Sequence, residues 1–144
     1  MKEPVAMTTY PALVGAFLAA KRKELGLSQS ALAESVGLTV STWSRIENGE
    51  SALTIEQLKL AGDKLNVLPS QILKDVDEKI IELQNRGVET NPVRVSIDEI
   101  HASGTIPLVG AALFGLISSP LMLVAASAAA SAVVTKLTKK LENS

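Results

Sequence analysis

Residues 39–48 read TVSTWSRIEN and carry the side chains whose types and spacing best suit a chemical role. On a helix, Trp43 and Ile46 would face inward, together with Val36 and Leu38 just before them. The side chains left facing outward are Val40, Ser41, Thr42, Ser44 and Arg45. Small polar groups and one guanidinium on a short projecting helix can enter the major groove of duplex DNA and reach base edges. A plain solvated face is the alternative, because Ser and Thr are common on protein surfaces.

Groups suited to catalysis or metal binding are scarce in this sequence. The 144 residues include one His and no Cys, which excludes disulfides, Cys-rich zinc sites and a Cys nucleophile. The single His, His101, argues against a His-based metal site and a Ser–His relay, and we assign it no ligand role. Aromatic residues make up 3% of the chain, too few to stack single-stranded nucleic acid. We therefore expect no enzymatic activity, no metal and no cofactor.

Capping residues and glycines divide residues 9–70 into short helices. Ser, Thr and Pro favour helix starts and Gly favours helix ends. Thr54 and Gln57 have the S/T-x-x-E/Q spacing of a capping box, in which each residue satisfies the other's backbone N–H. The predicted helices span 9–25, 29–36, 39–48 and about 54–65, and a fifth begins near Pro69. Five short helices joined by tight glycine turns predict a compact all-α domain.

Residues 27–50, LSQSALAESVGLTVSTWSRIENGE, resemble the phage-repressor (Xre/Cro-type) helix-turn-helix family. The resemblance covers residues 13–68, and its specific elements are S-Q-x-x-L-A opening the second helix, Gly37 in the turn, and W-S-R-I-E-N-G closing the third helix. It implies a five-helix repressor-type domain whose second helix crosses the DNA backbone and whose third helix enters the major groove.

The resemblance also implies roles for matching positions. Gln29 would contact a phosphate or a base edge, and Asn48 would donate to a phosphate. The positions implied to face bases are Val40, Ser41, Thr42 and Arg45. Thr39 and Ser44, on or next to the same helix, complete the set. The predicted DNA-binding residues are Gln29, Thr39, Val40, Ser41, Thr42, Ser44, Arg45 and Asn48.

Three further residues of the motif have structural roles. Arg22 and Glu47 match a family pair that joins the first helix to the end of the third. We interpret this pair as structural, because burying one charge without the other would be costly. Trp43 occupies a core position, so we expect it to pack inside the domain rather than stack on DNA.

The charge balance of the domain predicts weak binding by a single copy. Residues 10–68 contain six Lys or Arg and six Asp or Glu, so they are neutral. Phosphate neutralisation supplies much of protein–DNA affinity, and Glu50 lies where the family often carries basic or polar groups. Paired copies would compensate through avidity. We therefore expect a homodimer or a higher homo-oligomer.

The region after the domain offers a means of pairing. A longer helix is predicted from Pro69 to Arg86, and its apolar residues, Leu73, Val76, Ile80 and Leu83, form a seam along one side. Within residues 71–87 this seam either pairs with a second copy or packs onto the domain itself. Residues 88–105 are predicted to be a linker. Val93, Val95 and Ile97 alternate with polar residues, which is consistent with a short strand after Pro92.

The last part of the chain is strongly apolar. Residues 106–134 form 29 residues without a charge, within a predicted Gly/Ala-rich helical segment over 106–141. About 20 helical residues cross a bilayer core, and small residues recur at spacings that allow close helix packing. Three interpretations compete: a single membrane span, a helical hairpin turning near Pro120, and two helices buried in a soluble homo-oligomer. We favour membrane association through the hairpin.

These observations predict a sequence-specific regulator of transcription, most simply a repressor, that binds double-stranded DNA. Lys2 and Glu3 are followed by no signal peptide, so we expect a cytoplasmic DNA-binding domain, with inner-membrane association through the C-terminal segment. The C-terminal segment would concentrate a weak DNA-binding unit. Two alternatives are an antitoxin-like protein-interaction module and a small membrane-active protein with an N-terminal DNA-binding domain.

Overall fold

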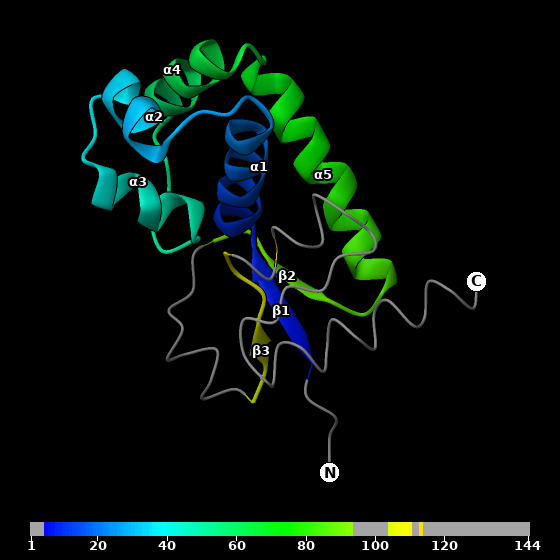
Figure 1. Ribbon diagram of the computed structural model, residues 1–144. Coiled ribbons are helices and arrows are strands. Elements are labelled where there is room, and N and C mark those ends of the chain that lie inside the picture. Colours follow the sequence, from blue (N-terminus) through cyan, green and yellow to red (C-terminus); the bar gives the residue numbers. More distant parts are fainter. Residues whose placement is uncertain (1–4, 94–103, 111–112, 114–144) are drawn as a thin grey trace.

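The computed structural model describes residues 5–93, 104–110 and 113. Within these residues, five helices are accompanied by three short strands (Figure 1). The elements, in chain order, are β1 (Ala6–Thr9), α1 (Tyr10–Glu24), α2 (Gln29–Val36), α3 (Val40–Glu47), α4 (Ile55–Leu65), α5 (Pro69–Asn85), β2 (Glu89–Asn91) and β3 (Ile106–Pro107). The five predicted helices are therefore confirmed, and the described part of the chain is mostly helical.

Hydroxyl side chains begin the first four helices, because they satisfy backbone N–H groups that lack a partner inside the helix. The hydroxyl of Thr9 accepts from the backbone of α1, and Ser28 does the same for α2. Thr54 and Gln57 form the predicted capping box of α4. The fifth helix has no side-chain cap, and Pro69 occupies its first turn. Local sequence signals thus explain where each helix starts.

The core surrounds α1, which runs through the middle of the molecule with α2, α3 and α4 to one side and α5 to the other (Figure 1). Leu13 and Leu18 of α1 and Trp43 of α3 are essentially inaccessible to solvent. The backbones of α1 and α3 approach so closely that a Cβ on Gly15 would lie 2.0 Å from the carbonyl oxygen of Ile46. Gly15 therefore allows α3 to sit directly against α1.

The apolar seam predicted on the fifth helix faces the domain's own core. Val76 and Leu83 are fully buried there, and Leu73 and Ile80 are partly buried against the same cluster. On α5, the large apolar side chain that remains exposed is Ile81. The seam is therefore occupied within one copy of the chain and is not a free pairing surface.

A small parallel sheet joins the two ends of the described chain, so the prediction of an all-α fold was wrong in this respect. Strand β1 lies in the centre and pairs in parallel with β2 and with β3. The strand predicted after Pro92, through Val95 and Ile97, lies mostly outside the described residues, and β2 lies just before Pro92, at Glu89–Asn91. β1, most of which precedes the predicted start of the domain at residue 9, is integrated into the domain, because Ala6, Thr8 and Thr9 are buried.

The beginning of the apolar tract belongs to this fold. Residues 106–107 form β3 rather than the start of a helix, and Leu108 and Leu113 are fully buried in the domain core. The prediction of a helical segment starting at residue 106 was therefore wrong for its first residues. Among residues 5–93, 104–110 and 113, no helix combines the length and the apolar character that crossing a membrane requires. The proposed hairpin near Pro120 lies outside the described residues.

Candidate nucleic-acid interface

A tight turn between α2 and α3 sets the orientation of the candidate recognition helix. Gly37 ends α2 with a φ of 74°, a left-handed conformation that side chains with a Cβ disfavour. Two residues later, the hydroxyl of Thr39 accepts a 3.2 Å hydrogen bond from the backbone N–H of Thr42 and so begins α3. The hydroxyl groups of Thr39 and Thr42 also lie 2.9 Å apart. The glycine that ends α2 and the hydroxyl that begins α3, both predicted from the sequence, are therefore present.

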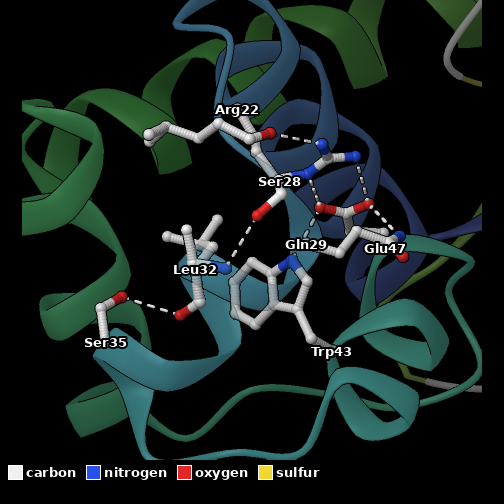
Figure 2. Close-up of polar contacts among 9 residues, drawn as sticks. Arg22, Ser28, Gln29, Leu32, Ser35, Trp43 and Glu47 are labelled. Carbon is white, nitrogen blue, oxygen red and sulfur yellow. Dashed lines mark hydrogen bonds and ion pairs between the residues drawn. The ribbon is translucent and has the colours of Figure 1, made fainter.

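A buried polar network fixes the inner face of α3 (Figure 2). The carboxylate of Glu47 accepts hydrogen bonds from Arg22 Nε at 2.6 Å and from Arg22 Nη2 at 3.0 Å. Trp43 Nε1 donates to the same carboxylate at 2.7 Å. Arg22 also donates from Nη1 to the carbonyl oxygen of Leu27, at 2.8 Å. This network ties α3 to α1 and to the loop before α2.

The environment of Glu47 favours its charged form. Burial by itself would raise the pKa of this carboxyl group. The hydrogen bonds from Arg22, Gln29 and Trp43, together with the charge of Arg22, outweigh the burial and lower the pKa below its ordinary value. Glu47 and Arg22 therefore form a buried ion pair with a satisfied set of partners, which is the arrangement that makes a buried charge tolerable.

The opposite face of α3 points to solvent. Among the predicted DNA-binding residues, Thr39, Val40, Ser41, Arg45 and Asn48 are exposed, whereas Thr42 and Ser44 are half-buried. Because the inner face of α3 is held by Trp43 and Glu47, this outer face has a defined orientation. A rigid helix that presents hydroxyls, one guanidinium and a terminal amide can contact base edges and phosphates.

Gln29 is placed differently from the other predicted contacts. It is the first residue of α2 and is half-buried, and its Nε2 donates a 2.7 Å hydrogen bond to Glu47 Oε2. Its amide is thus part of the buried network, which the sequence did not indicate. A contact from Gln29 to DNA would have to use its remaining hydrogen-bonding capacity or compete with Glu47.

Arg45 also has a partner that the sequence did not reveal. Its Nε lies 3.4 Å from Glu50 Oε2, and both side chains are substantially exposed. The turn after α3 brings Glu50 back, because the backbone N–H of Glu50 donates to the carbonyl oxygen of Arg45 at 2.8 Å. The one guanidinium on the outer face of α3 is therefore held by an acidic side chain.

Part of the amino-acid sequence matches a known protein family. Residues 18–72 match the family model described as "Helix-turn-helix". This match confirms the resemblance predicted for residues 13–68 and covers α2, α3 and α4 completely. A comparison with curated proteins gives no match.

A solved structure shares the fold. The clp gene regulator ClgR from Corynebacterium glutamicum aligns with a TM-score of 0.51 and 20% sequence identity. The alignment covers 59% of this chain and 86% of that chain. The family match identifies a helix-turn-helix region, and this structural likeness shows that the fold is shared.

Proposed function

We propose that this protein is a sequence-specific regulator of transcription that inserts α3 into the major groove of duplex DNA. The observation that carries the proposal is the two-sided character of α3. Its inner face is fixed by the buried Arg22–Glu47 pair, whereas its outer face presents small polar groups and the guanidinium of Arg45. Repression follows if the occupied site overlaps a promoter, because the bound protein then excludes polymerase.

Within this proposal, the predicted DNA-binding residues have different roles. The exposed Ser41 and Arg45, with the half-buried Thr42, read base edges. Thr39, Val40 and Ser44 border them. Gln29 and Asn48, which lie at the start of α2 and the end of α3, contact phosphates and set the register of the helix in the groove. A guanine is the preferred partner of Arg45, because its N7 and O6 match a guanidinium.

The proposal includes assembly of more than one copy. The matched domain carries as many acidic as basic residues, so one copy gains little from phosphate neutralisation. A two-fold dimer would bind an inverted repeat with half-sites about one helical turn apart. The apolar tract, most of which lies outside the described residues, is a proposed means of concentrating copies in an oligomer or at a membrane.

Selection from a pool of duplexes with randomised sequence tests this function. The full chain should enrich a defined sequence, and Arg45→Ala should abolish the preference while leaving the thermal unfolding midpoint almost unchanged. Lys74→Ala is the matched control, because Lys74 is an exposed, ion-paired cation on α5, across α1 from α3. Equal loss of binding in the two variants, or no enrichment by the unchanged protein, would contradict the proposal.

A further inference from the structure

A segment from beyond the matched domain lies against the end of α3. This docked segment comprises residues 104–110 and includes β3. Its backbone bonds to β1: Ile106 N–H donates to the carbonyl oxygen of Val5 at 2.9 Å, and Leu108 N–H donates to that of Met7 at 2.7 Å. The Thr8 hydroxyl, buried with it, donates to the carbonyl oxygen of Leu108 at 2.8 Å. The docked segment is thus anchored by main-chain and side-chain bonds.

Apolar burial reinforces this anchoring. Leu108 is fully buried in the domain core, as is Leu113 shortly after it. Burying a leucine side chain stabilises a protein by roughly 1.5–3 kcal/mol, so the docked segment has a preferred position on the domain. The first residues of the apolar tract are therefore a structural part of the DNA-binding unit.

The docked segment contacts the residues that end the recognition helix. A Cβ built on Gly110 would lie 2.9 Å from Asn48 Oδ1 and 3.6 Å from Asn48 Cα. Val109 Cγ1 lies 3.7 Å from the position of a Cβ on Gly49. Gly49 is packed more closely on its other side, because the same Cβ would lie 2.6 Å from the Cβ of Ala12. The end of α3 is thus enclosed between α1 and the docked segment.

We propose that the docked segment positions Asn48 for its contact with a DNA phosphate, and that Gly110 is the positioning residue. Asn48 is exposed at the end of α3, where its backbone N–H still bonds within the helix. Only a residue without a Cβ leaves room for the present position of the Asn48 side chain. The inference rests on the proposed function, because it assigns a second element to the same interface.

Two glycines of the docked segment provide a matched pair of substitutions. Gly110 and Gly104 both have a positive φ, of 54° and 73°, so an added Cβ strains the backbone at either position. At Gly110 the new Cβ meets Asn48, whereas at Gly104 it meets nothing within 4 Å. Because the atom it meets is the end of a side chain that can rotate, Gly110→Ala should displace Asn48 without disrupting the fold.

The experiment measures the affinity of the full chain for a duplex selected from a randomised pool. Gly110→Ala should weaken binding by about tenfold, the effect expected for one lost hydrogen bond to a charged group. Gly104→Ala should leave the affinity unchanged within about twofold, with a thermal midpoint similar to that of Gly110→Ala. The Asn48 side-chain amide signal in a nuclear magnetic resonance spectrum should shift in Gly110→Ala and stay in place in Gly104→Ala.

Repeating both substitutions together with Asn48→Ala separates positioning from stability. Asn48→Ala alone should weaken binding about as much as Gly110→Ala, and adding Gly110→Ala should then cost nothing further. An equal loss with and without Asn48→Ala would overturn the inference, as would equal effects of the two glycine substitutions.

If Gly110→Ala does not fold, Val109→Ala replaces it, with Val93→Ala as the exposed control. The expected pattern is then a loss for Val109→Ala that disappears in the presence of Asn48→Ala.

The outcomes distinguish this inference from the proposed function. If the unchanged protein selects no duplex, the proposed function fails. If it selects a duplex that Arg45→Ala no longer recognises, but Asn48→Ala and Gly110→Ala bind that duplex normally, the proposed function stands and the positioning role is overturned.

Discussion

The guanidinium of Arg22 on α1 meets the carboxylate of Glu47 on α3 through two buried hydrogen bonds, of 2.6 and 3.0 Å. This pair connects the central helix of the domain to the candidate recognition helix. Trp43 and Gln29 donate to the same carboxylate, so one buried acidic group organises α1, α2 and α3 together. The orientation of the outer face of α3 depends on this network.

Removing the charge of Glu47 should therefore destabilise the domain. Glu47→Gln leaves the Arg22 guanidinium buried without a counter-charge, and breaking a buried pair in this way costs about 3–5 kcal/mol. Unfolding in urea measures the loss. Glu24→Gln is the control, because Glu24 forms an exposed ion pair with Lys21 on the same α1 and should cost less than about 1 kcal/mol. Similar losses for the two variants would show that the network does not hold the domain together.

The lowered pKa of Glu47 predicts a specific acid sensitivity. In the unfolded chain this carboxyl should titrate near its ordinary value of 4.5, whereas in the folded protein its pKa lies below that value. Its stabilising contribution is therefore fully present above pH 4.5 and is lost as the pH falls through the lower folded pKa. The free energy of unfolding should fall more steeply on acidification in the unchanged protein than in Glu47→Gln. Parallel curves would contradict the assignment.

The contact between Arg45 and Glu50 predicts that the acidic residue weakens DNA binding. Glu50→Gln releases the guanidinium and removes a negative charge that would lie near phosphates. Because an exposed ion pair is worth at most about 1 kcal/mol, affinity for the selected duplex should rise by up to about fivefold. Glu78→Gln, which breaks an exposed pair on α5, should have no effect. A loss of affinity in Glu50→Gln would instead mean that Glu50 helps Arg45 to bind.

Burial of Leu108 predicts that the first residues of the apolar tract stabilise the domain. Leu108→Ala should lower the free energy of unfolding by about 2–5 kcal/mol, as expected for a cavity in a packed core. Val93→Ala is the comparison, because Val93 is 62% exposed and its truncation should change stability by less than about 0.5 kcal/mol. Denaturation of both variants, followed by circular dichroism, checks this. An unaffected Leu108→Ala protein would place the tract outside the folded unit.

The helices of this protein were predictable because their signals are local. Each hydroxyl cap accepts a hydrogen bond from a backbone N–H three residues away. Gly37 ends α2 because glycine readily adopts the left-handed backbone conformation found there. The burial of Trp43 followed from helical spacing. The pairing of Arg22 with Glu47 followed from the family resemblance, since the spacing of the two residues alone does not indicate a contact.

The sheet and the partners of two site residues were not predictable in the same way. The strands are only four, three and two residues long, too short for an alternating pattern to stand out. Thr8 bonds to Leu108 across 100 positions of sequence, which no local signal encodes. The bond from Gln29 to Glu47 and the pair between Arg45 and Glu50 depend on how the turns bring α2, α3 and the following loop together.

The most direct test of base reading by α3 is a comparison of base preferences in the presence and absence of the Arg45 guanidinium. Each base pair of the selected duplex is changed in turn, and binding is measured for the unchanged protein and for Arg45→Ala. We predict that one position costs the unchanged protein about 1–3 kcal/mol and costs Arg45→Ala nothing. If Arg45→Ala lowers the affinity for every duplex equally, Arg45 contacts only the backbone and α3 does not read sequence through it.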